Sequence, residues 1–113
     1  METSTYFKFL EKIEKIPVSE SRIDSVNIKE FVVKSDFLTE LHLIFKNFFG
    51  STFKAPGERP TPADKKHAAF LGGIREEQTL YYTEREGYAH CAMLWPWTDG
   101  RRTTVKLAQN HLV

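Results

Sequence analysis

The strongest constraint on this chain lies in its last third, where two short turns separate three apolar segments. The segments run approximately over residues 77–83, 88–97 and 102–109. Asp99-Gly100 is typical of a two-residue hairpin turn, because a mirror-image turn needs positive φ at both central positions. Residues 85–87 (REG) fit a three-residue loop with glycine in the left-handed position. Tight turns join antiparallel neighbours, so the sequence predicts a three-stranded antiparallel meander.

The same two turns predict which side chains share a face of the sheet. Counting from Asp99-Gly100 places Trp95 opposite Thr104, and counting from the other turn places Tyr82 opposite His90. One predicted face holds Leu80, Tyr82, His90, Ala92, Leu94, Val105 and Leu107. The other holds Thr79, Tyr81, Cys91, Met93, Trp95, Trp97, Arg102, Thr104 and Lys106. Neither set is polar, whereas a sheet with one wet face alternates apolar and polar residues, so we expect both faces to be covered.

The earlier part of the chain shows helical periodicity. Apolar residues recur every three or four positions over 5–16, which predicts a first helix. A second helix is expected between a cap at Ser35 or Asp36 and a stop at Gly50, with a wide apolar arc typical of a core helix. Thr61, followed by a proline and an aspartate, is a start signal for a third, short helix.

The fold class follows from these elements. The β-branched content near residues 26–33 favours a fourth strand, although its imperfect alternation would require a bulge. The chain has 113 residues, 41% of them hydrophobic, which is enough for a core without disulfides or metal. We therefore expect one α+β domain over residues 1–113, with helices in the N-terminal half followed by the antiparallel meander.

Composition limits the classes of function. Sixteen Lys and Arg against fifteen Asp and Glu leave a formal charge of +1, which argues against a strongly basic nucleic-acid binder. The single cysteine excludes an internal disulfide and a cysteine-cluster zinc site. Because no apolar run approaches the roughly 20 residues of a membrane span, we expect no membrane association. With no export signal, the expected location is the cytoplasm.

The predicted face that carries both tryptophans is the leading candidate for function. Its cover could be helices of the same chain, a second copy of the chain, or a ligand. Tryptophan, methionine and arginine are enriched at the centres of protein interfaces. The sequence therefore predicts a non-enzymatic interaction module that binds a protein partner, expected to be a second copy in a homodimer. Its binding residues would be Met93, Trp95, Trp97, Arg102 and Lys106.

Binding of single-stranded nucleic acid is the first alternative. Unpaired bases stack on Trp or Tyr beside Arg, and the same tryptophan face offers that combination. Residues 54–106 hold nine basic side chains against seven carboxylates, so attraction of phosphate would be weak unless folding segregates the two signs. The outline of helices followed by a meander, with Arg and His, is also similar to that of compact ribonuclease toxins, a likeness of shape alone.

A small acid–base enzyme is the second alternative. Tyr82, His90 and His111 are predicted to gather at one end of the meander, where imidazole, phenol and the carboxylate of Glu84 could move protons. The same group would equally close the end of the sheet by hydrogen bonds. Adjacent His90 and Cys91 point to opposite faces of a strand, and no metal-ligand or phosphate-loop spacing occurs. We therefore expect neither a metal nor a cofactor.

Overall fold

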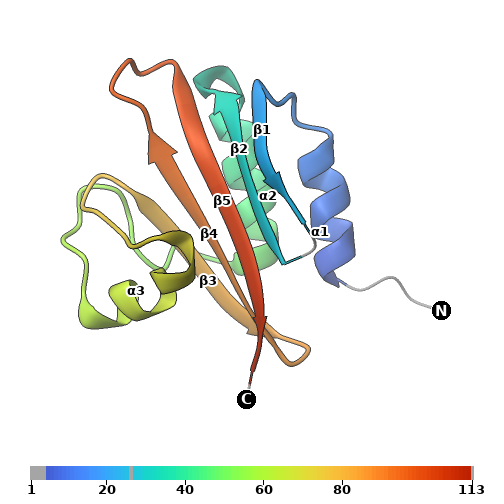
Figure 1. The fold of residues 1–113 in the computed structure, drawn as a ribbon, viewed down its shortest axis with the longest axis vertical. Helices are drawn as coiled ribbons and strands as arrows, with labels where there is room; N and C mark the ends of the chain where they lie inside the picture. The colour runs from blue at the N-terminus through green and yellow to red at the C-terminus, as the bar shows by residue number, and fades with distance from the viewer. Residues whose placement is uncertain (1–4, 26, 113) are drawn as a thin grey trace.

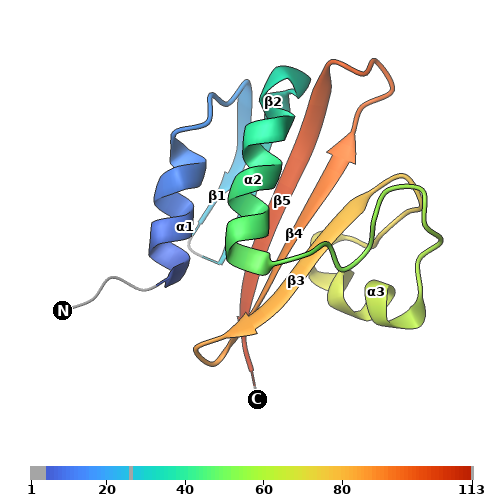
Figure 2. The ribbon, with the colours of Figure 1, turned by 180° about the vertical axis from the view of Figure 1, so that it is seen from behind.

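The computed structural model describes residues 5–25 and 27–112. Over these residues the chain forms an antiparallel sheet with helices on both of its faces (Figures 1 and 2). The helices are α1 (Thr5–Glu14), α2 (Leu38–Phe49) and α3 (Pro62–His67), with two short 3-10 turns, η1 (Ser35–Phe37) and η2 (Ala69–Leu71). The strands are β1 (Glu20–Asp24), β2 (Ile28–Lys34), β3 (Thr79–Arg85), β4 (Tyr88–Pro96) and β5 (Arg102–His111).

The α+β class is confirmed, but the sheet has five strands where three or four were expected. Their order is β1-β2-β5-β4-β3, and every neighbouring pair is antiparallel. The strand expected near residues 26–33 is β2, and Val26 lies outside the described residues. β1 was not predicted, because its five residues, ESRID, are all exposed and carry no apolar alternation.

The helices form over the predicted segments, but the expected cap of the second helix is wrong. Ser35 and Asp36 lie in η1, and Phe37, which directly precedes α2, makes no side-chain cap. Gly50 ends α2 with a positive φ of 85°, and its N–H donates to the Lys46 carbonyl. α3 begins with a complete capping box, in which the Thr61 hydroxyl and the Asp64 carboxylate each accept a backbone N–H from the other residue. No described helix has the length and apolar character needed to cross a membrane.

Neither of the two turns has the expected geometry. Glu86 and Gly87 alone connect β3 to β4, and both lie in the left-handed region, with φ of 54° and 82°. This is the mirror-image hairpin turn. Between β4 and β5 only Gly100 has positive φ (70°), and its N–H donates to the Trp97 carbonyl at 3.1 Å.

Only one of the two predicted registers holds. The β4–β5 register is confirmed, with Trp95 opposite Thr104. The β3–β4 register is wrong, because Tyr82 lies opposite Cys91 and not opposite His90. A turn shorter by one residue moves β3 by one position, and this sends each of its side chains to the other face.

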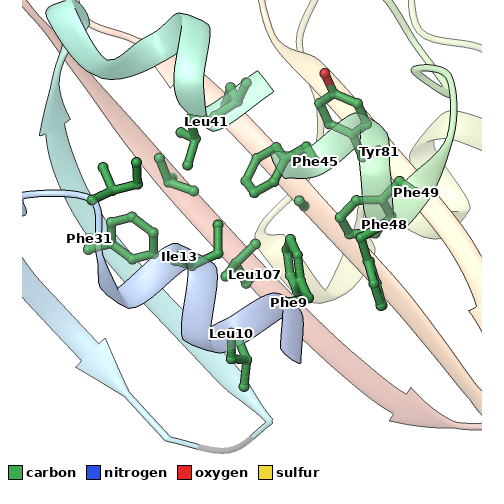
Figure 3. Packing of buried hydrophobic residues seen from close by; sticks show 14 of the residues in the cluster. Phe9, Leu10, Ile13, Phe31, Leu41, Phe45, Phe48, Phe49, Tyr81 and Leu107 are labelled. Atoms are coloured by element: carbon green, nitrogen blue, oxygen red, sulfur yellow. The ribbon is translucent and has the colours of Figure 1, made fainter. Parts of the chain in front are cut away.

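α1 and α2 cover one face of the sheet, and their apolar side chains form the main core with it (Figure 3). Phe45 and Leu41 of α2 are fully buried at its centre. Phe9 of α1 stacks on Phe48 of α2, with ring centroids 4.4 Å apart. The sheet contributes Phe31, Val33, Tyr81, Ala92, Leu94, Val105 and Leu107. The main core therefore lies between the two helices and strands β2 to β5.

The second face of the sheet is covered in part by α3, η2 and the loops around them. Ala68 and Leu71 pack on Leu80, Cys91, Met93 and Ala108 in a separate, smaller core. Lys54 holds the loop before α3 in place: it is 1% exposed, and its ammonium donates to the carbonyls of Ala55, Glu76 and Gln78. This layer covers β3 and β4 but leaves the side of the face toward β1 and β2 open (Figure 1).

Candidate functional site

The uncovered part of the second face carries both tryptophans, and we call it the Trp face. It extends across β1, β2, β5 and the end of β4, with Arg75 contributed by the loop after η2. Its residues are Glu20, Arg22, Glu30, Lys34, Arg75, Trp95, Trp97, Arg102, Thr104 and Lys106. Side chains alternate along a strand, so this set collects the residues that point away from α1 and α2.

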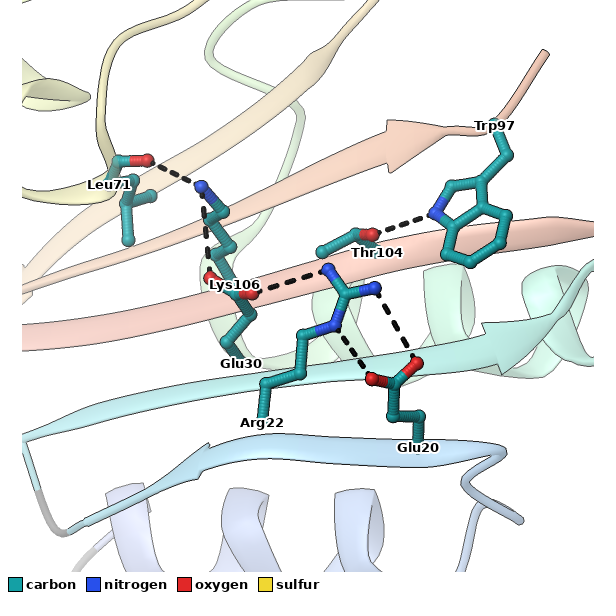
Figure 4. A network of polar contacts seen from close by, with 7 residues as sticks. All are labelled: Glu20, Arg22, Glu30, Leu71, Trp97, Thr104 and Lys106. Atoms are coloured by element: carbon teal, nitrogen blue, oxygen red, sulfur yellow. Dashed lines mark hydrogen bonds and ion pairs between the residues drawn. The ribbon is translucent and has the colours of Figure 1, made fainter.

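Trp97 is held in one orientation. Its indole Nε1–H donates to the Thr104 hydroxyl at 2.8 Å (Figure 4). The guanidinium groups of Arg102 and Arg22 lie 5.4 Å and 5.8 Å from the ring centroid, within the range of cation–π attraction. The only polar group of the indole is already bonded, and both guanidinium groups lie over this partly exposed ring, so a further flat group would contact it beside or in place of one of them.

Trp95 lies nearer the α3 layer, between two further cations. The Lys106 ammonium is 5.3 Å from the ring centroid and the Arg75 guanidinium is 5.4 Å from it. Lys106 also donates to the Leu71 carbonyl at 3.0 Å, which joins β5 to η2 (Figure 4). The ring is therefore fixed at the border between the covered and the open parts of the face.

Charge on the Trp face is strongly unequal. Arg22 pairs with Glu20 and Glu30, and Glu30 also lies 3.8 Å from Lys106. The other three cations, Lys34, Arg75 and Arg102, are exposed, and none of them has an ion pair among the described residues. Five cations against two carboxylates give the face an excess of three positive charges. The whole chain carries +1, so the remainder carries a formal charge of −2.

Two adjoining hollows lie along this face. The larger, of about 360 Å³, is a groove lined by Arg22, Glu30, Trp95, Pro96, Trp97, Thr98, Thr104 and Lys106. A second hollow of about 200 Å³ shares Trp95 and Lys106 with it and extends to Gly72 and Arg75. Together they form a path along the face that is lined by aromatic rings and cations.

The structure brings together most, but not all, of the predicted binding residues. Trp95, Trp97, Arg102 and Lys106 lie side by side as expected. Met93 is 1% exposed and packs under η2, so it belongs to the smaller core, although it also lines the second hollow beside Trp95.

Two cations of the Trp face, Arg22 and Lys34, were missed at the sequence level, and Arg75 was counted only as one of the nine basic side chains of residues 54–106. Arg22 lies in the unpredicted strand β1, and Arg75 lies in a loop with no motif. Lys34 ends the strand expected near residues 26–33, and its place opposite Arg102 follows from the β2–β5 pairing. No local signal marks any of the three.

The expected acid–base cluster is divided between the two faces. His90 packs on the helix side, where its ring centroid is 4.7 Å from that of Tyr6. Tyr82 lies on the other side, and its hydroxyl donates to the Glu84 carboxylate at 2.6 Å. The prediction that Tyr82 opposes His90 is wrong because of the shorter β3–β4 turn. A catalytic role for these residues stays a prediction.

A cleft of about 480 Å³ does contain part of the predicted cluster. It is lined by Lys66, His67, Tyr82, Glu84, Ala89, Cys91, Asn110, His111 and Leu112. His67 of α3 stacks on Tyr82, with ring centroids 3.7 Å apart. The ring of His111 lies 4.3 Å from that of Tyr88. Burial and the bond to Glu84 raise the pKa of Tyr82 to about 12, so this phenol is a proton donor to Glu84 and not a ready base.

Neither Cys91 nor a cluster of metal ligands provides a reactive centre in the described part of the chain. Cys91 is buried beside Met93 and Ala108, and burial raises the pKa of its thiol to about 12. A thiol in this environment is a poor nucleophile. Over the described ranges, no three His, Cys, Asp or Glu side chains converge in a way that could hold a metal ion.

Comparisons with known protein families, with curated protein sequences and with solved structures find no match to this chain. The geometry and charge of the Trp face are the features of the molecule that point to a function.

Proposed function

We propose that this protein is a non-enzymatic binding module that holds an anionic partner on its Trp face. The observation that carries the proposal is the segregation of charge: an excess of three positive charges surrounds two partly exposed tryptophans, in a chain whose total charge is +1. Cations that have no carboxylate partner, such as Arg102 and Arg75, keep their full attraction for an incoming anion. The tryptophan rings supply a large contact area, and their side chains lose little conformational freedom on binding.

Intrinsic fluorescence tests this proposal directly, because both tryptophans of the chain lie on the Trp face. The purified protein is titrated at low salt with two polyanions, poly-L-glutamate and oligo(dT). We expect at least one of them to shift or quench the tryptophan emission, and added salt to reverse the change. Absence of any change with both polyanions would contradict the proposal.

A pair of charge-matched variants separates this face from general electrostatics. Arg102→Glu places a negative charge beside Trp97, and we expect it to abolish the response. Arg59→Glu makes the same change in net charge on an exposed loop before α3 and should leave the response almost unchanged. Equal losses in the two variants would show that the Trp face is not the binding site.

Self-association through the Trp face stays a prediction, and charge opposes it. In a two-fold dimer the same patch meets itself, so the positive excess of one copy would face that of the other. Sedimentation velocity over a range of concentrations measures the outcome. If the wild type is a dimer, and the double variant Trp95→Asp, Trp97→Asp is a monomer with unchanged helical circular dichroism, then the partner of the Trp face is a second copy of the chain and not an anion. If the wild type sediments as a monomer at every concentration, the homodimer prediction is wrong.

A further inference from the structure

The Trp face combines two recognition elements in a fixed spacing. Trp95 lies in β4, and Trp97 follows directly after its end, where its N–H still donates to the Arg102 carbonyl. Two residues of extended chain separate the backbones of the two tryptophans by roughly 6.6 Å. Each indole has two cationic groups within 6 Å of its centroid. A partner that fits this face must therefore present flat apolar groups and negative charges in alternation.

Single-stranded nucleic acid has that alternation in every unit. Each nucleotide offers a planar base for stacking and a phosphate for a neighbouring cation, and base–aromatic stacking tolerates any sequence. In a duplex the base faces are already stacked, so rings on a sheet surface can reach them only in unpaired strands. An acidic peptide would satisfy Arg102 and Arg75 but has no flat group in each unit to cover the indoles.

The shape of the face agrees with a chain-like ligand. The groove at Trp97 and the hollow at Arg75 are joined through Trp95 and Lys106, so a strand could follow the path from one end to the other. The bond from Trp97 to Thr104 fixes the ring before any ligand arrives, which lowers the ordering cost of stacking. We infer that the partner of the Trp face is single-stranded nucleic acid, an inference that rests on the proposed function.

Binding is measured by the fluorescence anisotropy of labelled oligo(U) and oligo(dT) as the protein is added. The matching unlabelled duplex and poly-L-glutamate are then tested as competitors. We expect either single strand to bind in a salt-dependent manner, the unlabelled duplex to compete at least tenfold more weakly, and poly-L-glutamate to compete more weakly still. Arg102→Gln should reduce the slope of log affinity against log salt by about 0.7, the value for one phosphate contact on a single strand. Arg59→Gln should not change it.

Aromatic variants test stacking apart from charge. Trp97→Ala should weaken binding by about tenfold, the size expected for loss of one base–aromatic stack. Trp97→Phe should restore most of the affinity, because it keeps a stacking ring. Leu43→Ala removes a side chain that is 64% exposed on α2, away from the Trp face, and should bind like the wild type. Equal affinity of Trp97→Ala and wild type would overturn the inference.

The outcomes separate this inference from the proposed function. If poly-L-glutamate alters tryptophan emission and the single strands do not, the face binds acidic protein segments, and only the present inference fails. Equal competition by duplex and single strand also overturns it. If no polyanion affects emission, both proposals fail. Circular dichroism of each variant establishes that losses do not come from unfolding.

Discussion

At the scale of single residues, two basic side chains in the interior meet opposite environments. The buried ammonium of Lys54 is surrounded by three backbone carbonyls. Nδ1 of buried His90 has no hydrogen-bond partner within the described part of the chain. Burial lowers the pKa of His90 below the ordinary value of 6.5, with Arg85 adding to the effect and Glu86 opposing it. His90 thus folds as a neutral ring packed between aromatic groups.

This environment predicts a loss of stability in mild acid. The pKa of His90 is lower in the folded protein than in the unfolded chain, so the unfolded chain binds the proton first as the pH falls. The contribution of neutral His90 to the free energy of unfolding is therefore complete above pH 6.5 and is lost as the pH falls toward the lower folded pKa. We expect urea midpoints to fall between about pH 7 and about pH 5, the range in which histidine titrates. His90→Phe should make the decline in urea midpoint shallower. The decline that remains is expected to come from His42, because burial lowers the pKa of that histidine too.

The same substitution at exposed His111 serves as the control, because no buried ring is replaced there. A decline that is equally steep in His90→Phe and in wild type would show that burial of His90 is not its source.

At the scale of elements, the β3–β4 turn has the largest consequence. Glu86 occupies the left-handed region with φ of 54°, where residues other than glycine, asparagine and aspartate are strained. This short turn decides the register of β3, and through it the face on which Tyr81 and Tyr82 lie. One strained residue thereby places Tyr81 in the main core and Tyr82 beside α3.

Relief of this strain should stabilise the hairpin. Asparagine tolerates the left-handed region, so Glu86→Asn is expected to raise the free energy of unfolding by roughly 1 kcal/mol. Urea denaturation of the two proteins measures the difference. Glu77→Asn, at an exposed position without positive φ, should change stability much less. A destabilised Glu86→Asn would mean that the glutamate makes a favourable contribution that its backbone geometry does not reveal.

At the scale of the whole molecule, the sheet separates two cores of unequal size. Among the residues whose burial the structure describes, the core under α1 and α2 contains sixteen and the core under α3 and η2 contains six. Local opening requires less free energy where fewer apolar contacts are broken. The α3 layer also borders the Trp face through the bond from Lys106 to Leu71, so its opening would change the surroundings of Trp95.

We therefore expect the α3 layer to open without the rest of the fold. Amide hydrogen exchange should be faster in residues 62–71 than in α2. Leu71→Ala, which removes a side chain that is 4% exposed, should accelerate exchange in α3 by more than in α2 and cost about 2–5 kcal/mol if the site does not collapse. Uniform acceleration over both helices would show that the two cores unfold together.

Local rules account for the parts of this protein that the sequence predicted correctly. The Thr61 cap, the stop at Gly50 and the pairing of β4 with β5 each depend on residues close together in the chain. For the same reason the neighbouring Trp95 and Trp97 could be placed on one face beside Arg102 and Lys106. Periodicity and turn chemistry act over a few residues, so a single sequence is sufficient to reveal them.

The remaining features depend on contacts between distant segments. The cover over Met93 and the cations at positions 22, 34 and 75 carry no local signal, because each arises when one segment docks on another. The register of β3 is set by a local turn, but a glutamate in the left-handed region is not what its residue type predicts. Residues 54–106 alone have an excess of two basic side chains, and one of these bases, Lys54, is buried. Association of β1 and β2 with β5 brings Arg22 and Lys34 beside the tryptophans and concentrates the positive charge there. Charge segregation is a property of the folded surface, since it depends on which residues of remote strands share a face.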